Sequence, residues 1–257
     1  MSTERTASLR GRTAIVTGGS RGIGRAIVRR LAADGAAVVF SYGRDEASAR
    51  ETVEEVTGAG GVVWAERAEL SDLAQIERLF HAADECFGAQ KLDILVNNAG
   101  TFLRTPIGAT TEADFDRQMT VNAKAPFFAI QHAAERMGEG GRIVNVSTVT
   151  TRWPRTQEAV YAASKAALEQ FTWIATRELG GRGITVNVVS PGPTDSGEKG
   201  ILRSATTDES REEVARQTPL GALGRTTDVA GAVAFLVGPD GGWITGQNLR
   251  VDGGLVW

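Results

Sequence analysis

The stretch Thr17-Gly-Gly-Ser-Arg-Gly-Ile-Gly24 decides the fold of this chain, because it joins a short apolar run at 13–17 to a helical segment at 22–33. Glycines let the backbone turn tightly and approach a ligand, and the first N–H groups of the helix then face an anion. Their spacing differs from the usual G-x-G-x-x-G, but their position between strand and helix predicts a pyrophosphate-binding loop. A structural turn without a nucleotide is the alternative. The residues expected to face the nucleotide are Gly18, Ser20, Arg21, Gly22, Ile23 and Gly24.

Beyond this loop, short apolar β-rich segments alternate with segments of helical periodicity. Such short strands separated by helices indicate a parallel sheet that is buried on both faces. Because crossovers between parallel strands are right-handed, the pattern predicts an α/β, doubly wound Rossmann fold, a seven-stranded parallel sheet with helices on both faces. The expected strands are residues 13–17, 36–41, 61–65, 92–97, 142–147, 184–189 and 247–251, and the expected helices are 22–33, 45–57, 71–87, 112–137, 158–179 and 228–237.

The residues after the second expected strand bear on the choice of nucleotide. NAD usually meets a carboxylate there, which binds the ribose 2′-hydroxyl. This chain has Ser41-Tyr42-Gly43-Arg44 instead, with Arg21 nearby in the glycine loop. A guanidinium grips a phosphate through two parallel hydrogen bonds, so we expect NADP(H) rather than NAD(H). The alternative is that Arg44 is solvated and Arg21 packs over the adenine without discriminating.

The length of 257 residues fits one large α/β domain. We expect a single NAD(P)-binding Rossmann-fold domain over 1–257, with a flexible tail at 1–10. The polar stretch 191–219 is the least structured part, and a long excursion from a compact domain is typical of a substrate loop or lid. A surface insertion without a role is the alternative.

Composition argues against several classes of protein. Hydrophobic residues make up 42% of the chain, and the net charge is −3 without a long basic run, so we expect no nucleic-acid partner. Cys86 with His81 and His132 offers no metal cluster, so we expect no metal. Residues 1–12 lack the apolar core of a secretory signal, and no apolar run reaches the roughly 20 residues that span a bilayer. We therefore expect a soluble cytoplasmic protein that does not enter a membrane.

Tyr161 and Lys165 are four residues apart in Tyr161-Ala-Ala-Ser-Lys165, and residues at that spacing share a helix face. The ammonium favours the phenolate, so we expect it to lower the tyrosine pKa from its reference of about 10. A phenol tuned in this way exchanges a proton with a substrate oxygen near neutral pH. The pair alone is also typical of a solvated helix face; the glycine loop upstream makes it a candidate catalytic pair.

Further motifs occur in a fixed order along the chain. They are Thr17 to Gly24 (TGxxxGIG), Asn97-Asn-Ala-Gly100 (NNAG), Asn122 within Val121-Asn-Ala-Lys-Ala-Pro-Phe127, Tyr161 to Lys165 (YxxxK), Pro191-Gly192, and the C-terminal stretches 219–225 and 243–254. With these motifs, residues from about 10 to 257 resemble the short-chain dehydrogenase/reductase superfamily, and within it the 3-oxoacyl-[acyl-carrier-protein] reductase-like members.

The resemblance implies a role for each matching residue. Tyr161 would donate the proton in reduction, Lys165 would hold the nicotinamide ribose and lower the tyrosine pKa, and Asn122 would anchor a water in a proton relay. Asn98, Ala99 and Gly100 would line the adenosine side, and Pro191, Gly192 and Thr194 the nicotinamide side. Ser41, Tyr42, Arg44, Glu69 and Leu70 complete the expected cofactor-binding set. Members are commonly tetramers built on helices near 112–137 and 158–179, so we expect a homotetramer.

Three positions depart from the family pattern. The catalytic serine usually lies 13 residues before the tyrosine, where this chain has Thr148, while Ser147 lies 14 before. We favour Thr148, whose extra methyl crowds the pocket; an inserted loop residue would favour Ser147 instead. Glu69-Leu70 stands where an aspartate usually caps the adenine. The start of the expected lid, 195–199, is polar.

The favoured interpretation is an NADPH-dependent reductase that transfers a hydride to a ketone or aldehyde carbonyl of a small-molecule substrate, 3-oxoacyl or related. The alternatives are an NAD-linked alcohol or sugar dehydrogenase and, in another class, a non-catalytic NADP(H)-binding sensor. We expect substrate identity to lie in the loops 101–106, 149–158 and 193–216. Arg104, Arg152 and Arg155 in these loops either meet an acidic substrate or, as we favour, are surface charges.

Overall fold

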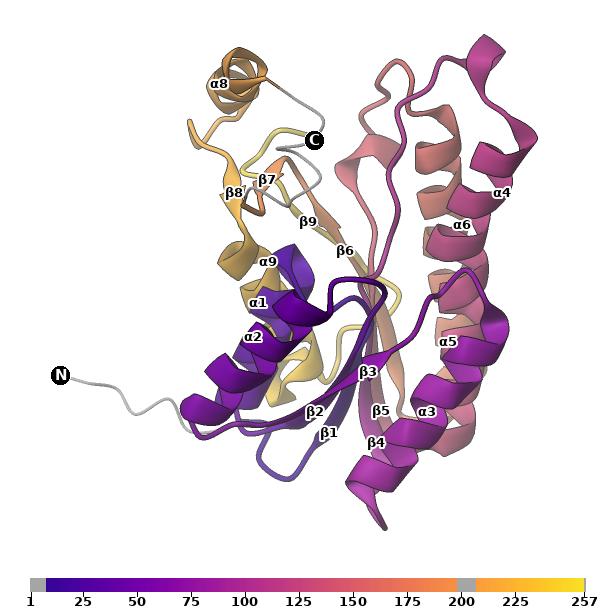
Figure 1. Ribbon diagram of the computed structural model, residues 1–257, viewed down its shortest axis with the longest axis vertical. Helices are drawn as coiled ribbons and strands as arrows, with labels where there is room; N and C mark the ends of the chain where they lie inside the picture. Colours follow the sequence, from indigo (N-terminus) through magenta and orange to yellow (C-terminus); the bar gives the residue numbers. More distant parts are fainter. Residues whose placement is uncertain (1–7, 198–206, 257) are drawn as a thin grey trace, which may run out of the picture.

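The centre of the protein is a sheet of seven strands, all parallel, in the order β3-β2-β1-β4-β5-β6-β9. The computed structural model describes residues 8–197 and 207–256 (Figure 1). The strands are β1 Thr13–Val16, β2 Ala37–Tyr42, β3 Val62–Arg67, β4 Leu92–Asn97, β5 Met137–Val146, β6 Thr185–Pro191 and β9 Asn248–Val251. The doubly wound Rossmann fold predicted from the sequence is confirmed.

Helices cover both faces of this sheet (Figure 1). One face carries α1 (Gly22–Ala33), α2 (Glu46–Gly58) and α9 (Thr226–Val237), and the other carries α3 (Leu73–Phe87), α5 (Ala125–Arg136) and α6 (Ala159–Leu179). The residues of the central strand β1 contribute to both layers. Ala14 and Val16 pack into the core of the α1 and α9 face, whereas Ile15 packs into the core of the α3 and α5 face. Because successive strand residues point to opposite faces and both faces are covered at the centre of the sheet, all four residues of β1 are buried.

The strand order reverses at the centre of the sheet. β1 pairs with β2 on one side and with β4 on the other, so the crossovers run in opposite directions from this point. In an open α/β sheet, ligands bind in the crevice outside the carboxyl ends of the strands at such a reversal. The loops that follow β1, β4, β5 and β6 leave from this edge.

The helix expected over 112–137 is present, but it is not α-helical throughout. The structure has α4 (Glu112–Met119), a π-helical turn at Thr120–Lys124, and then α5. Pro126 lacks an N–H and so cannot donate to the carbonyl of Asn122, four residues earlier, which interrupts the regular α-helical ladder. Single π-helical turns are frequent at functional sites, and this one contains Asn122.

The stretch 191–219 contains more structure than expected. Its described part holds a short strand, β7 (Thr194–Asp195), which pairs with β8 (Gly224–Arg225), and the helix α8 (Asp208–Gln217). The charged residues 208–217 form α8, and the Thr207 side chain caps this helix by accepting from the Ser210 N–H. The rest of the expected loop, 198–206, lies outside the described residues.

The flexible tail expected over 1–10 extends too far. Residues 1–7 lie outside the described part, but Leu9 is buried in the core and its N–H donates to the Asp34 carbonyl. Within the described residues, no helix combines the length and the apolarity needed to cross a bilayer. The same part of the chain contains no group of three or more His, Cys, Asp or Glu side chains arranged to hold a metal ion.

Candidate active site

A cavity of about 700 Å³ opens at the carboxyl edge of the sheet. The candidate catalytic side chains Thr148, Tyr161 and Lys165 line it. So do all the expected cofactor-binding residues: Gly18, Ser20, Arg21, Gly22, Ile23, Gly24, Ser41, Tyr42, Arg44, Glu69, Leu70, Asn98, Ala99, Gly100, Pro191, Gly192 and Thr194. Of the predicted site residues, Asn122 alone does not line the cavity.

The glycine loop is held between its two neighbouring strands by hydrogen bonds. The Asn98 amide donates to the carbonyls of Thr17 and Gly18, at 2.9 and 3.1 Å. The Thr17 hydroxyl accepts from the backbone N–H groups of Asn98 and Ala99, both at 3.0 Å. On the other side, the Gly18 N–H donates to the Ser41 hydroxyl at 3.1 Å. The loop is thus fixed in shape by β2 and β4.

Two positions in this loop admit no side chain. A Cβ at Gly24 would lie 2.0 Å from the Gly18 carbonyl oxygen, and a Cβ at Gly19 would lie 2.5 Å from Phe40 Cβ. Arg21, the N-cap of α1, makes no side-chain cap, so the first N–H groups of the helix have no cap from that residue. A pyrophosphate fits this cradle by chemistry, because free helix N–H groups and close backbone approach are what it requires.

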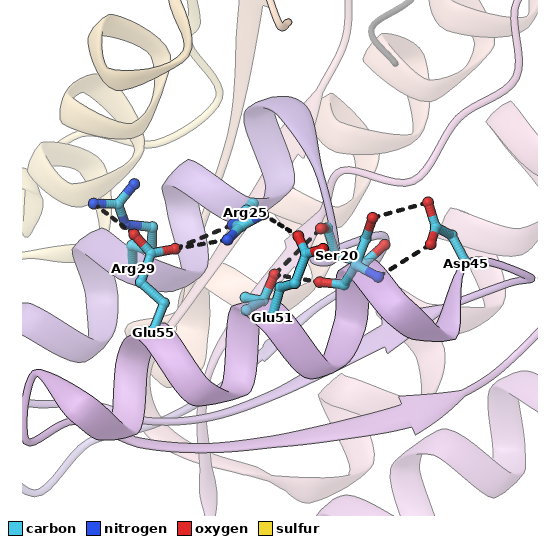
Figure 2. Close-up of polar contacts among 8 residues, drawn as sticks. Ser20, Arg25, Arg29, Asp45, Glu51 and Glu55 are labelled. Carbon is cyan, nitrogen blue, oxygen red and sulfur yellow. Dashed lines mark hydrogen bonds and ion pairs between the residues drawn. The ribbon is translucent and has the colours of Figure 1, made fainter. Parts of the chain in front are cut away.

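The first two helices are joined by ion pairs and hydrogen bonds (Figure 2). Arg25 of α1 contacts Glu51 and Glu55 of α2, at 3.3 and 2.9 Å. The Thr52 hydroxyl donates to the Ser20 carbonyl at 3.2 Å, so α2 also supports the glycine loop directly. Arg25 is therefore engaged away from the cavity and is no candidate for phosphate binding.

Arg44 lines the cavity with its side chain 80% exposed, so its guanidinium is accessible to a ligand. Its Nε lies 3.3 Å from the Oε2 atom of Glu69, so the glutamate that stands where the family usually has an aspartate has a hydrogen-bond partner. Asp45 also lines the cavity, but its carboxylate caps α2 and accepts from the N–H of Ser48 at 3.0 Å. The carboxylate nearest the end of β2 is thus committed to a helix cap, and the exposed cation fits a 2′-phosphate better than a 2′-hydroxyl.

Asn122 is fully buried and positions the loop beside Lys165. Its Oδ1 accepts from the Thr101 N–H at 2.8 Å, and its Nδ2 donates to the Thr101 carbonyl at 2.9 Å and to the Ser164 hydroxyl at 3.1 Å. A Cβ at Gly100 would lie 3.2 Å from the Asn122 Oδ1. The side chain therefore holds the backbone after β4; its role in a water relay stays a prediction.

Tyr161 and Lys165 both face the cavity from α6, but their pKa values differ from our expectation. Burial raises the pKa of Tyr161 to about 12, an effect that hydrogen bonding from Thr148 opposes and the charge of Glu158 reinforces. Burial also lowers the pKa of Lys165 to about 8, while Glu169 acts in the opposite direction. The expected lowering of the tyrosine pKa by Lys165 is wrong, because desolvation of the phenolate dominates. The Lys165 ammonium donates instead to the Val146 carbonyl at 2.8 Å.

The two candidate hydroxyls before the tyrosine have different partners. Ser147 Oγ donates to the buried Glu169 carboxylate at 2.6 Å, and the Thr151 hydroxyl donates to the same carboxylate at 2.8 Å. Thr148 faces Tyr161, whose pKa it lowers by hydrogen bonding. The geometry therefore supports Thr148 as the hydroxyl beside the phenol.

Sequence reasoning missed part of the cavity wall. Arg117 and Val121 line it from α4 and the π-helical turn, and Glu158 lines it from the residue before α6. Arg104 and Arg155 line it as well, whereas Arg152 does not and instead borders a separate hollow beside Arg250. No motif or spacing signals which of these charged loop residues turn inward.

Comparisons with known proteins agree with this geometry. Residues 18–256 match the family described as enoyl-(acyl carrier protein) reductase. An NADPH-dependent aldehyde reductase-like chloroplastic protein of Arabidopsis thaliana is 40% identical, over 96% of this chain and 95% of its own. A blue fluorescent protein from a metagenomic library, solved with NADPH, is 45% identical with a TM-score of 0.90, covering 96% of this chain and 99% of its own. An angucycline C-6 ketoreductase solved with NADP is 42% identical with a TM-score of 0.92, covering 98% of each chain.

The fold and the cavity define a dinucleotide-binding α/β protein whose cavity is lined by a tyrosine and a lysine of α6. The chain belongs to the short-chain dehydrogenase/reductase superfamily.

The buried Lys165 gives a prediction for the stability of the cofactor-free protein. Between a folded-state pKa of about 8 and the ordinary value of 10.5, the unfolded chain holds a proton that the folded chain lacks. Raising the pH through that window therefore favours the folded state. From about pH 8 to about pH 10, the free energy of unfolding of the wild type should rise relative to that of Lys165→Met.

Urea unfolding of both proteins at several pH values measures this difference. Tyr161 acts with the opposite sign, because its folded-state pKa is raised, but only above about pH 10. A difference between the two proteins that stays flat across the window would contradict the burial of the ammonium.

Proposed function

We propose that the protein is an NADPH-dependent reductase of ketone or aldehyde carbonyls, 3-oxoacyl or related. One observation carries the proposal: the phenol of Tyr161, the hydroxyl of Thr148 and the phosphate cradle at 18–24 line one cavity. The similarity to an aldehyde reductase-like protein and to a ketoreductase supports reduction of a carbonyl. Two of the similar structures were solved with NADPH or NADP, which supports the cofactor.

The side chains of the cavity have distinct tasks in this reaction. Bound NADPH supplies the hydride for the carbonyl carbon. Tyr161 donates a proton to the developing alkoxide, and its raised pKa keeps the phenol protonated at neutral pH, the state that a donor needs. Thr148 stabilises the same oxygen with a hydrogen bond, for which its hydroxyl turns away from Thr150. Lys165, held at the Val146 carbonyl, provides the nearby cation.

The choice of NADP(H) rests on Arg44, with Arg21 beside it in the glycine loop. Arg44 is the exposed cation after β2, and the neighbouring Asp45 is committed to the α2 cap. An NAD-linked dehydrogenase would need a free carboxylate at this position. A non-catalytic NADP(H)-binding sensor would not need the Tyr161 and Thr148 hydroxyls that line the cavity.

We also propose that the chain is one domain, with 191–219 as its substrate loop. All seven strands share one sheet, which supports a single unit. Thr194 and Ser196 line the cavity, and Arg211 of α8 pairs with Asp195 at 3.0 Å, so the described parts of this stretch are tied to each other beside the site. A cytoplasmic location stays a prediction from the sequence.

Replacing Tyr161 tests the proposed proton donor. Tyr161→Phe removes the hydroxyl and keeps the ring, which meets Phe102 edge to face at 4.8 Å. General acid catalysis contributes about 10²- to 10⁴-fold, so the turnover of a carbonyl substrate should fall at least about a hundredfold. NADPH binding, followed by fluorescence, should be retained. Near-normal turnover of the Tyr161→Phe variant would show that Tyr161 is not the proton donor.

Replacing Arg44 tests the cofactor. Arg44→Ala should weaken NADPH binding by about tenfold or more, because a charge-assisted hydrogen bond to phosphate is lost, and should leave NADH binding nearly unchanged. Arg50→Ala is the matched control: Arg50 is an exposed arginine of α2 that pairs with Glu46 and does not line the cavity. Equal losses for both nucleotides would contradict the phosphate assignment.

We further propose that the protein is a homotetramer built on the helices α4, α5 and α6. Phe127 of α5 and Ile174 of α6 are 44% and 51% exposed, and the Phe127 ring packs on Phe171 of α6 at 5.1 Å. Such an exposed apolar face is typical of an interface. Analytical ultracentrifugation should give about four times the chain mass of 27.2 kDa. Phe127→Asp should lower the assembly state, and a monomeric wild type would contradict the proposal.

A further inference from the structure

A buried carboxylate lies between two arginines at the substrate end of the cavity. Glu158 is 4% exposed, and its Oε2 accepts from the Thr150 hydroxyl at 3.2 Å. Its Oε1 lies 3.6 Å from Arg104 Nε and 3.9 Å from Arg155 Nε. Charge-assisted hydrogen bonds are about 2.7–2.9 Å long, so neither guanidinium nitrogen is hydrogen-bonded to this carboxylate. Both arginines are attracted to the charge of Glu158, but this carboxylate does not satisfy their hydrogen-bonding capacity.

Arg104 has a buried hydrogen-bond donor that lacks an acceptor. Its Nε is buried and has no hydrogen-bond partner among the described residues. A buried donor without an acceptor is uncommon and calls for an explanation, such as a missing ligand. The Arg104 side chain is 31% exposed overall and lines the cavity, so its guanidinium is within reach of a bound molecule.

The cluster is held in place rather than solvated. The Thr105 N–H donates to the Gln157 carbonyl at 2.7 Å, which joins the two loops that carry the arginines. Gln157 has a φ of 69°, and it is the only non-glycine residue in the described part with a positive φ. Such backbone persists where its surroundings impose it, and it tends to occur at functional sites. The guanidinium of Arg155 also stacks over the Trp153 ring, 5.1 Å from its centroid.

Charge at this end of the cavity is not balanced. Two arginines, Arg104 and Arg155, lie here against the single carboxylate of Glu158, and Arg117 is a further cation in the wall of the cavity. Phe102 and Trp153 line the same region and provide apolar wall. A ligand that satisfies both features has an apolar body and an anionic group.

The arginine pair is also close to the reacting groups. The Thr148 hydroxyl donates to the Thr150 hydroxyl at 3.2 Å, and Thr150 donates in turn to Glu158. Two hydrogen bonds thus separate the hydroxyl proposed to meet the carbonyl from the carboxylate between Arg104 and Arg155. The anion and the carbonyl fit on one small molecule.

We infer that the substrate carries a carboxylate, bound by Arg104 and Arg155 on their cavity side, together with an apolar body and the carbonyl that faces Tyr161 and Thr148. This inference rests on the proposed carbonyl reduction. It replaces our expectation that Arg104 and Arg155 are surface charges, and keeps that expectation for Arg152.

Calorimetry with NADP⁺-saturated protein tests the inference without requiring turnover, because NADP⁺ cannot deliver a hydride. The probes are two aryl keto acids, benzoylformate and 4-oxo-4-phenylbutanoate, and the methyl ester of each. At least one acid should bind about tenfold tighter than its ester, since the ester has lost the anion. Arg104→Gln and Arg155→Gln should each reduce that advantage about tenfold and leave ester binding nearly unchanged.

Two further variants sharpen the result. Arg152→Gln removes the same charge from the same loop outside the cavity, so it should change neither affinity. Glu158→Gln keeps an acceptor for Thr150 but removes the competing charge, so it should strengthen acid binding severalfold. Unchanged NADP⁺ affinity in every variant shows that the fold is intact.

The outcomes separate the inference from the proposed function. Esters that bind as tightly as the acids, no binding of either, or an equal loss in Arg152→Gln would overturn the carboxylate site. Acids that bind as expected but are not reduced with NADPH would uphold the site and overturn the proposed reduction of these carbonyls.

Discussion

A parallel sheet has to be covered on both faces, and this constraint governs the whole molecule. Ala14 and Val16 are buried on one face and Ile15 on the other, so both faces of the central strand are occupied by core packing. A ligand can therefore be reached by loops from distant segments at the edge where the strands end. The reversal of strand order between β1 and β4 opens a crevice there, and the cavity occupies it.

The two halves of the cavity are built in different ways. The nucleotide half is held by hydrogen bonds to the main chain of the glycine loop, such as those that the Asn98 side-chain amide donates to the Thr17 and Gly18 carbonyls. The substrate half is held by loops, one of them with the strained Gln157. Loops vary more readily than the elements that they join. A single fold can therefore serve relatives named for different carbonyl substrates.

Burial has opposite effects on the two groups of the Tyr-Lys pair. It disfavours the charged form of each, which raises the pKa of Tyr161 and lowers the pKa of Lys165. The phenol is thereby kept as a proton donor, and the ammonium becomes easier to neutralise. The Lys165 ammonium is directed to the Val146 carbonyl, so its influence on the phenol is weaker than sequence spacing alone indicates.

The sequence by itself determined the fold class, the glycine loop, the tyrosine and lysine, and the cation after β2. Each of these features depends on a local pattern of residues: the periodicity of hydrophobic residues, the positions of glycines, or a spacing of four residues along a helix. Tertiary structure decided what depends on contacts between distant residues. In the folded protein Ser147 is hydrogen-bonded to Glu169, which leaves Thr148 as the hydroxyl beside the tyrosine. Arg104 and Arg155 line the cavity, whereas Arg152 lies outside it. Tertiary structure also set the direction of the tyrosine pKa, because desolvation and the reach of a charged side chain depend on what packs around a residue in space, and no local pattern along the chain records that.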